Sequence, residues 1–307
     1  MKKIVLIFPV IAGILWGSAG VFVRILNEFG MERYTILSTR MLVASVILLL
    51  ALLIFDREKL KIKLKDIWLF LGSGILGILG LNFCYNEAVN QLTLSLAAIL
   101  LSLAPIFAMF LSAILFREKI TVKKIGCMFL AIVGCVLASG ALDSAAGLRW
   151  SAGGIVIGIL SAFFCALYGI FSKLAANKGY STYTIIFYSL LIITIVLLPA
   201  TNWGTFTAFL QEAPAPNTLF AVAHSVCTSI LPYALYSIAL LHMENGKVSI
   251  LAGGGEPMAA VIMGALFFSE IPTILNILGL IITITALSLL CMSPKSTGTD
   301  IDKTQKS

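Results

Sequence analysis

The sequence has little charge for its length. Only 11% of its 307 residues are Asp, Glu, Lys or Arg, whereas 60% are hydrophobic. A soluble domain carries about 25% charged residues, so a water-soluble globular fold is excluded. The two histidines lie far apart, and the six cysteines match no metal-ligand spacing and no disulfide framework. A phosphate-binding loop and a set of nucleophile, histidine and acid are also missing. We therefore expect no enzyme, no metal and no cofactor.

Long uncharged stretches fill most of the chain instead. A membrane-spanning helix needs roughly 20 consecutive apolar residues, and the strands of a membrane barrel would alternate polar and apolar residues, which these stretches do not. The first stretch follows two lysines as in a signal peptide, but it continues for a full span without a clear cleavage site. We predict an all-α integral membrane protein with ten transmembrane helices, at residues 4–24, 35–55, 67–87, 93–116, 123–141, 152–174, 182–200, 217–240, 247–268 and 274–292.

Positive charge falls on one side of this topology. If the amino terminus is cytoplasmic, 17 of the 21 lysines and arginines lie in cytoplasmic segments. Cytoplasmic loops are typically rich in these residues, so we predict that both termini are cytoplasmic and that the protein lies in the cell (cytoplasmic) membrane. The net charge of +7 reflects this topology and predicts no nucleic-acid surface. The polar segment 293–307 is expected to be a disordered tail, and residues 201–216 an interfacial loop anchored by Trp203, Phe206 and Phe209.

The sequence also contains an internal repeat. The stretch "PIFAMFLSAILFRE" at 105–118 resembles "PMAAVIMGALFFSE" at 257–270, and each runs from a proline to a glutamate thirteen residues later. Upstream, "YNEAV" at 85–89 matches "YSIAL" at 236–240. Repeats of this kind indicate that the chain folds as two related units.

The repeat divides the chain into a first five-helix unit at 1–142 and a second at 150–292. Because five is odd, the two units must be inverted relative to each other in the membrane. Inverted repeats are typical of secondary transporters, whose binding sites lie near the bilayer midplane between the halves.

These features resemble a known family. Trp16 and Gly17 in the first span, Arg40 in the second and the doubled Tyr/Ala, Pro, Glu and Gly pattern are similar to the drug/metabolite transporter superfamily. The chain looks like an EamA-type ten-helix member over roughly residues 4–292. The resemblance implies transport, and export rather than uptake. The sequence departs from the family at "GGGEP", where the family has a bulkier aliphatic residue before Glu-Pro.

Glu256 is the ionisable residue predicted nearest to the middle of a span. Lipid cannot solvate such groups, so each is a functional hypothesis by default. Glu256 is either a contact for a substrate amine or a proton-coupling acid, or else a carboxylate that satisfies backbone groups freed near a proline. The predicted hinge or bend residues are Pro105, Pro257, Gly253, Gly254 and Gly255, with the proline bend shared by both halves.

Other polar and aromatic residues within spans are weaker candidates. His224 could relay protons or be a hydrogen-bonded packing residue. Asn82 and Asn86, with Tyr85 beside them, form a strip that suits either a cavity or a clamp between helices. Trp16 and Tyr168 occupy comparable positions in the two halves, where they line a cavity or simply pack.

Two further charged residues are read as structural. We expect Arg40 to reach the interface or to pair with Glu28 or Glu32. Glu87 is expected at the outer end of its span, in reach of water, and is not a predicted site residue.

The predicted function is a secondary transporter that exports small uncharged or zwitterionic metabolites, such as amino acids, by alternating access around a midplane cavity. Polyspecific efflux of lipophilic cations, with Glu256 as the membrane carboxylate, is the alternative, and a membrane-embedded enzyme or lipid scaffold is disfavoured. Phosphorylated substrates need cations at the site, and Arg40 is the one Lys or Arg within a predicted span interior. The expected partners are the substrate, the lipid bilayer and protons as a candidate coupling ion, with no nucleic acid. The sequence does not decide whether the protein is a monomer or a homodimer.

Overall fold

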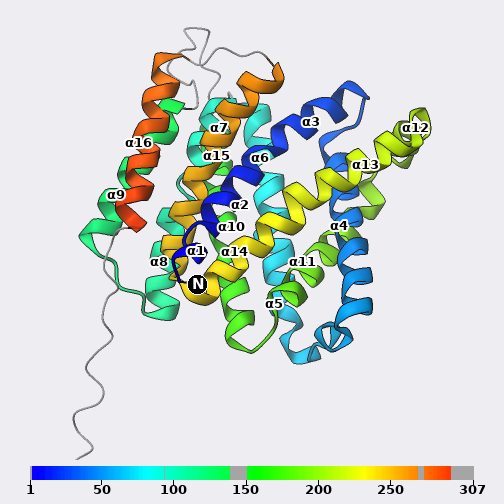
Figure 1. The fold of residues 1–307 in the computed structure, drawn as a ribbon, viewed down its shortest axis with the longest axis horizontal. Helices are drawn as coiled ribbons and strands as arrows, with labels where there is room; N and C mark the ends of the chain where they lie inside the picture. The colour runs from blue at the N-terminus through cyan, green and yellow to red at the C-terminus, as the bar shows by residue number, and fades with distance from the viewer. Residues whose placement is uncertain (1, 93, 139–150, 269–272, 292–307) are drawn as a thin grey trace, which may run out of the picture.

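The structure is a computed structural model that describes residues 2–92, 94–138, 151–268 and 273–291, and all regular structure in these residues is helical (Figure 1). The predicted tail at 293–307 and Glu270 of the repeat lie outside the described residues. The α-helices are α1 (Lys2–Val5), α2 (Phe8–Gly17), α3 (Ala19–Glu28), α4 (Arg33–Phe55), α5 (Ile67–Leu71), α6 (Gly80–Gln91), α7 (Leu94–Leu101), α8 (Ala104–Phe116), α9 (Val122–Ala138), α10 (Ala152–Asn177), α11 (Thr182–Leu197), α12 (Trp203–Glu212), α13 (Pro214–Ser225), α14 (Leu231–His242), α15 (Asn245–Phe268) and α16 (Ile274–Cys291). Short 3₁₀ turns lie at η1 (Arg57–Leu60), η2 (Leu64–Asp66) and η4 (Leu198–Ala200).

Eight helical segments of the described chain are long and apolar enough to cross a membrane, which confirms the expected all-helical, multi-span membrane protein. Helices α9 and α16, in the two remaining predicted spans, are shorter and do not reach that standard over their described residues. They pack side by side at one edge of the molecule (Figure 1). The eight segments are Phe8–Glu28, Arg33–Phe55, Leu64–Gln91, Ile99–Phe116, Ala152–Asn177, Thr182–Ala200, Pro214–His242 and Asn245–Phe267.

Several spans depart from a regular α-helix. In the first, α2 ends at Gly17 and α3 begins at Ala19, with the Ser18 hydroxyl donating to the Leu15 carbonyl at 2.7 Å. Two π-helical stretches, η3 (Gly72–Leu79) and η5 (Val226–Ile230), lie in the third span of each half. π-helical turns are rare and frequently mark functional sites, so the third spans are of interest in both halves.

The two aligned prolines lie in different backbone contexts. In the first half, α7 ends at Leu101 and α8 begins at Ala104, so Pro105 occupies the first turn of α8, where a missing N–H leaves no helix bond unmade. In the second half, α15 runs uninterrupted through Gly253–Pro257. The helix is therefore interrupted in the first half alone, which differs from the shared bend that the repeat predicts. The side chain of Pro257 lies outside the described part.

The predicted interfacial loop at 201–216 is instead the helix α12 followed by the start of α13. The Asn202 side-chain oxygen accepts a hydrogen bond from the Thr205 N–H at 3.3 Å and caps α12, in the manner typical of Asn at a helix start. Phe209 is buried at 3% exposure and packs edge-on against Phe29 and Phe220. It is a packing residue rather than an interfacial anchor.

Helix α15 lies at the centre of the packing, in contact with α2, α8, α9 and α16 (Figure 1). Its contact with α2 is the closest. Gly13 and Gly17 of α2, one turn apart, lie against the backbone of α15 at Ala252 and Glu256, with no room for even a Cβ atom. Small residues at such spacing allow close approach of helices in a membrane.

The three consecutive glycines of α15 contact different helices. Gly255 lies against the Val10 carbonyl of α2, Gly254 lies against Leu287 of α16, and Gly253 approaches Pro105 of α8. Successive residues of an α-helix point about 100° apart, so the triplet allows three helices to pack around α15. In the structure these glycines are packing positions within a continuous helix.

We predict that Gly255→Ala destabilises the protein. An alanine Cβ would lie 2.5 Å from the Val10 carbonyl oxygen, and overpacking of this kind costs about 1–3 kcal/mol. The melting temperature of the purified protein in detergent should therefore fall by several degrees. Gly126→Ala in α9, where a Cβ meets no atom within 4 Å, is the matched control. Equal melting temperatures for the two variants would contradict this assignment.

Candidate functional site

Glu256 lies halfway along α15, which has 24 residues. Its side chain is partly buried, and among the described residues no hydrogen bond or ion pair engages its carboxylate. A carboxylate at this depth needs a proton or a cation, because lipid cannot solvate its charge. No group of three metal-ligating residues exists in the described part of the chain.

Four aromatic residues lie together beside this position, and we call Trp16, Tyr168, Tyr233 and Tyr236 the aromatic cluster. The ring of Tyr233 contacts Trp16 and Tyr168, with centroid distances of 5.2 and 4.9 Å, both in edge-on geometry. Tyr236 lies 5.5 Å from Trp16 and 5.9 Å from Tyr168. The cluster thus joins the first spans of both halves, α2 and α10, to α14.

Glu256 and the aromatic cluster belong to one region. The backbone of Glu256 lies against Gly17, the residue after Trp16. The Glu256 charge is within electrostatic range of Tyr233 and also of Tyr85 on α6. Of the predicted residues, Trp16 and Tyr168 thus belong to one cluster, while Glu256 is related to it through Gly17 and Tyr233.

The predicted asparagine strip does not act as one unit. The Asn82 side chain donates to the Ile78 carbonyl at 2.8 Å and so satisfies an acceptor at the end of the η3 stretch. The Asn86 backbone carbonyl accepts from Arg33 at 3.4 Å, near the end of α6. These contacts favour the structural reading of Asn82. Glu87 accepts from Gln91 at 2.9 Å, as befits a residue at a helix end.

His224 lies apart from Glu256. It is 2% exposed, and its ring stacks on Phe22 of α3 with centroids 5.0 Å apart and planes inclined by 16°. The Nε2 atom is enclosed and has no hydrogen-bond partner among the described residues. His224 is within electrostatic range of Arg40, and the two residues form a second polar group in the bundle.

Arg40 does not form the ion pair that the sequence predicts. Among the described residues no carboxylate pairs with it, neither Glu28 nor Glu32. Its Nη1 atom lies 3.5 Å from the Thr228 hydroxyl, a long hydrogen bond, and its Nε atom is enclosed without a partner. The alternative that Arg40 pairs with one of these glutamates is therefore wrong, and the alternative that it reaches the interface stays a prediction.

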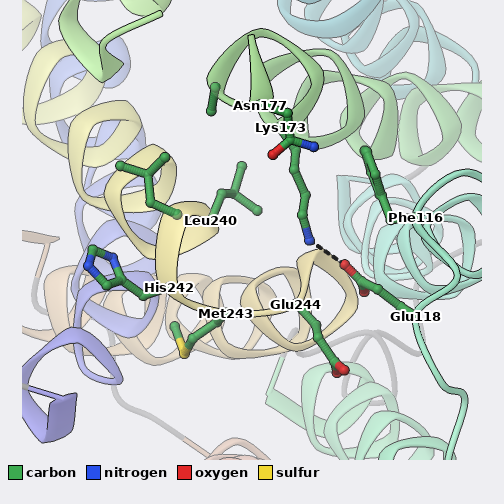
Figure 2. A pocket seen from close by; sticks show the side chains of 10 residues that line it. Phe116, Glu118, Lys173, Asn177, Leu240, His242, Met243 and Glu244 are labelled. Carbon is green, nitrogen blue, oxygen red and sulfur yellow. Dashed lines mark hydrogen bonds and ion pairs between the residues drawn. The ribbon is translucent and has the colours of Figure 1, made fainter. Parts of the chain in front are cut away.

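A third group closes one end of the bundle around Glu118. This carboxylate accepts hydrogen bonds from the backbone N–H groups of Asn245, at 3.0 Å, and Gly246, at 3.5 Å, which form the start of α15. The ammonium of Lys173 on α10 donates to the same carboxylate at 2.5 Å (Figure 2). An anion at a helix N-terminus is favourable because of the helix dipole, so Glu118 holds the ends of α8, α10 and α15 together.

This group continues inward to the aromatic cluster. The Asn245 amide donates to the Ser112 hydroxyl at 2.9 Å, and the Tyr236 hydroxyl donates to Asn245 at 3.5 Å. We call Glu118, Lys173, Asn245 and Ser112 the Glu118 network. An open cavity of about 620 Å³ lies beside it, lined by Phe116, Glu118, Lys173 and the 240–244 segment (Figure 2).

Most of these partners carry no recognisable signal in the sequence. Tyr236 and Glu118 stand within the repeated stretches, yet the repeat marks them as architectural and says nothing of their contacts. Tyr233 and Asn245 carry no sequence signal apart from their position in or near a span. Lys173 would be recognised only by pairing it with an acid 55 residues away in the chain.

Residues 3–140 and 152–292 each match the family model of the EamA-like transporter family. The chain belongs to this family. The resemblance to the drug/metabolite transporters is thereby confirmed, and the chain is a two-repeat member of a transporter family rather than of an enzyme family.

Two bacterial transporters are similar to this chain over most of its length. An uncharacterized transporter from Bacillus subtilis, YxxF, is 23% identical over 99% of this chain and 96% of its own length. The pseudopaline exporter CntI from Pseudomonas aeruginosa is 26% identical over 80% of this chain and 83% of its own. A solved crystal structure, with 15% sequence identity, superposes with a TM-score of 0.73 over 94% of this chain and 96% of that chain, and so shares the fold.

We predict that Glu118→Ala loosens the first turn of α15. The backbone N–H groups of Asn245 and Gly246 lose a charged acceptor, and such a hydrogen bond contributes about 1.5–3 kcal/mol. Hydrogen–deuterium exchange of this turn should accelerate about tenfold or more. Glu87→Ala, at a different helix end, should leave the turn unchanged. Unaltered exchange in the Glu118 variant would show that the network does not hold this end.

Proposed function

We propose that this protein is a secondary transporter that exports small uncharged or zwitterionic metabolites, such as amino acids, across the cytoplasmic membrane. The observation that carries the proposal is Glu256, a carboxylate without a partner among the described residues, halfway along α15 and beside the aromatic cluster. An ammonium group is attracted both to a carboxylate and to aromatic faces. The region therefore has the chemistry to hold the amine of a small metabolite.

Helix packing supports an inverted repeat of two five-helix halves. If the halves exchange roles, the contact of α15 with α2 should have a counterpart in a contact of α8 with α10, and α8 and α10 do pack together. Likewise, α10 packs on the third span of the first half, and α2 packs on α14 in the third span of the second. Helices α4 and α11, the second spans, pack on each other.

Polar contacts between segments support the predicted topology. Lys173 with Glu118, Lys178 with Asp66 and Lys124 with Glu244 each join segments that the charge pattern assigns to the cytoplasm. At the predicted outer side, Arg33 bonds to Asn90 and Ser151 to Gln91. We propose on this basis that both termini are cytoplasmic.

The Glu118 network supports the proposal of alternating access. The Glu118 network closes the cytoplasmic end, where α15 meets α8 and α10. Opening it requires that α15 moves away from Glu118, and the carboxylate of Glu256 lies on the same helix. Binding of a proton or of a substrate amine at Glu256 changes the charge on α15. This change links the occupancy of the Glu256 site to the opening of the Glu118 network at the other part of the same helix. Export as the direction is supported by the relative named as a pseudopaline exporter.

We predict that Glu256→Gln abolishes flux driven by a pH gradient in proteoliposomes, since the neutral amide cannot take up a proton. The panel contains amino acids and lipophilic cationic dyes, measured with and without the gradient. Transport of amino acids supports the proposal, whereas transport of dyes alone supports the cation-efflux alternative. Glu87→Gln is the matched control at a helix end. A Glu256→Gln protein with normal flux and an unchanged pH dependence would exclude coupling through this residue.

The topology is tested with single cysteines in a variant that lacks the six native ones. A cysteine at Glu270 should react with an impermeant maleimide added outside intact cells. A cysteine at Lys119, next to Glu118, should react only after the cells are permeabilised. The opposite pattern of labelling would overturn the inverted repeat.

A further inference from the structure

A second polar group in the bundle has no role in the site built around Glu256. It consists of Arg40 on α4 and of His224, Thr228 and Ser229 on the α13–η5 segment, and we call it the Arg40 group. Helix α4 packs against both α13 and η5. His224 precedes the π-helical stretch, and Thr228 and Ser229 lie within it. A π-helical turn changes the helical register and often accompanies a functional site.

The Arg40 group is rich in hydrogen-bond donors whose partners are missing. The Arg40 Nε, the His224 Nε2 and the Ser229 Oγ atoms are all enclosed and have no hydrogen-bond partner among the described residues. His224 is 2% exposed and Ser229 is fully buried. Buried polar atoms nearly always have partners, so these exceptions on two segments that pack against each other point to a partner that is a molecule outside the protein chain.

The charge of Arg40 identifies what this partner must supply. A guanidinium group cannot lose its proton in a protein, and Arg40 lies seven residues, about 10 Å, beyond the start of α4. The side chain of Arg40 is partly buried and its Nε atom is enclosed, and an enclosed charge without a counterion is unfavourable. Among the described residues no carboxylate pairs with it. Water would satisfy donors but carries no charge, so an anion fits the group better.

The chemistry of the donors favours a carboxylate over a phosphate. A guanidinium binds a carboxylate through two parallel N–H···O bonds, and the histidine and serine can donate to its remaining lone pairs. A phosphate carries more charge and needs more cations, and the Arg40 group contains one arginine. Neutral donors complete the group.

The Arg40 group is also connected to the central site. Arg40 is within electrostatic range of Tyr233, and Tyr233 is within range of Glu256. Tyr233 is thus within electrostatic range of a cation and of a carboxylate that have no ion-pair partner among the described residues. A zwitterion presents the complementary charges, with an ammonium for Glu256 and a carboxylate for Arg40.

We propose that Arg40, His224 and Ser229 form a subsite for the carboxylate of the transported substrate. This inference rests on the proposed transport function and narrows its substrates to carboxylate-bearing metabolites, α-amino acids above all. In this proposal Arg40 binds a ligand, whereas a structural role would pair it with a glutamate of the chain. Lipophilic cations lack the group that this subsite would bind.

The first test measures the transport of each amino acid and of its amide in counterflow assays with proteoliposomes that contain the protein. The wild-type protein should transport free acids and reject amides by about tenfold or more, because an unpaired donor group penalises an analogue that lacks its partner. Arg40→Lys should reduce transport of the acids, since it loses the two-point geometry, and Arg40→Met should abolish it. Equal transport of acids and amides, or normal transport by Arg40→Met, would overturn the subsite.

The second test needs no transport. Because Arg40 has no counterion in the empty protein, Arg40→Met should leave the melting temperature unchanged or raise it. Arg33→Met on the same helix, which removes hydrogen bonds to Asn86 and Asn90, is the control and should lower or preserve it. A clear fall for Arg40→Met would show that Arg40 is a structural residue.

A third measurement separates failure of the subsite from failure of the transport proposal. If the wild-type protein transports no amino acid, the proposed function is wrong as stated. Sodium propionate should then still raise the melting temperature of the wild type above that in sodium chloride of equal ionic strength, and should not do so for Arg40→Met. Equal melting temperatures in the two salts would overturn the carboxylate subsite itself.

Discussion

The close contact between α15 and α2 is the constraint on which the site depends. Gly13 and Gly17 lie against the backbone of α15, and Gly255 lies against that of α2, so the two helix axes approach more closely than side chains would allow. This contact carries Glu256 to the point where the first span is interrupted at Ser18. Interrupted membrane helices expose backbone groups and are typical of transporter binding sites. The small residues on both helices allow the close contact, and the close contact positions the Glu256 backbone beside this interruption.

The two halves share an architecture but use it differently. In the first half the span is interrupted before Pro105, and Glu118 beyond its end holds the start of α15 and Lys173. In the second half α15 is continuous and carries the carboxylate of Glu256 at its middle. One glutamate thus closes an end and the other lies at the centre. A transporter needs both functions, because a site that is never closed from one side cannot move its substrate.

Apolar run length and the repeat were sufficient to predict an all-helical, multi-span membrane protein, because the bilayer sets helix length directly; eight of the ten predicted spans are long and apolar enough to cross a membrane in the described chain. The interruptions could not be predicted, since Ser18 and the two π-helical stretches depend on tertiary contacts of ordinary sequences. Glu256, Trp16 and Tyr168 could be found because ionisable or large aromatic residues stand out in an apolar span. Tyr233 and the roles of Asn245 and Lys173 could not, as a hydrogen-bond partner far along the chain leaves no local pattern. Arg40 could be recognised in the sequence as a charged residue within a span, but its role depended on whether a carboxylate lies near it in the fold.

The separation of Arg40 from Glu256 explains why both charges can persist in the bundle. Opposite charges in a membrane interior normally pair with each other, and a direct pair would satisfy both residues and leave nothing for a ligand to do. Here Tyr233 of the aromatic cluster is in electrostatic range of each. Each charge is stabilised only when protons, water or a ligand reach it. The unpaired charges thus lower the stability of the ligand-free protein and, in the proposed subsite, contribute free energy to ligand binding.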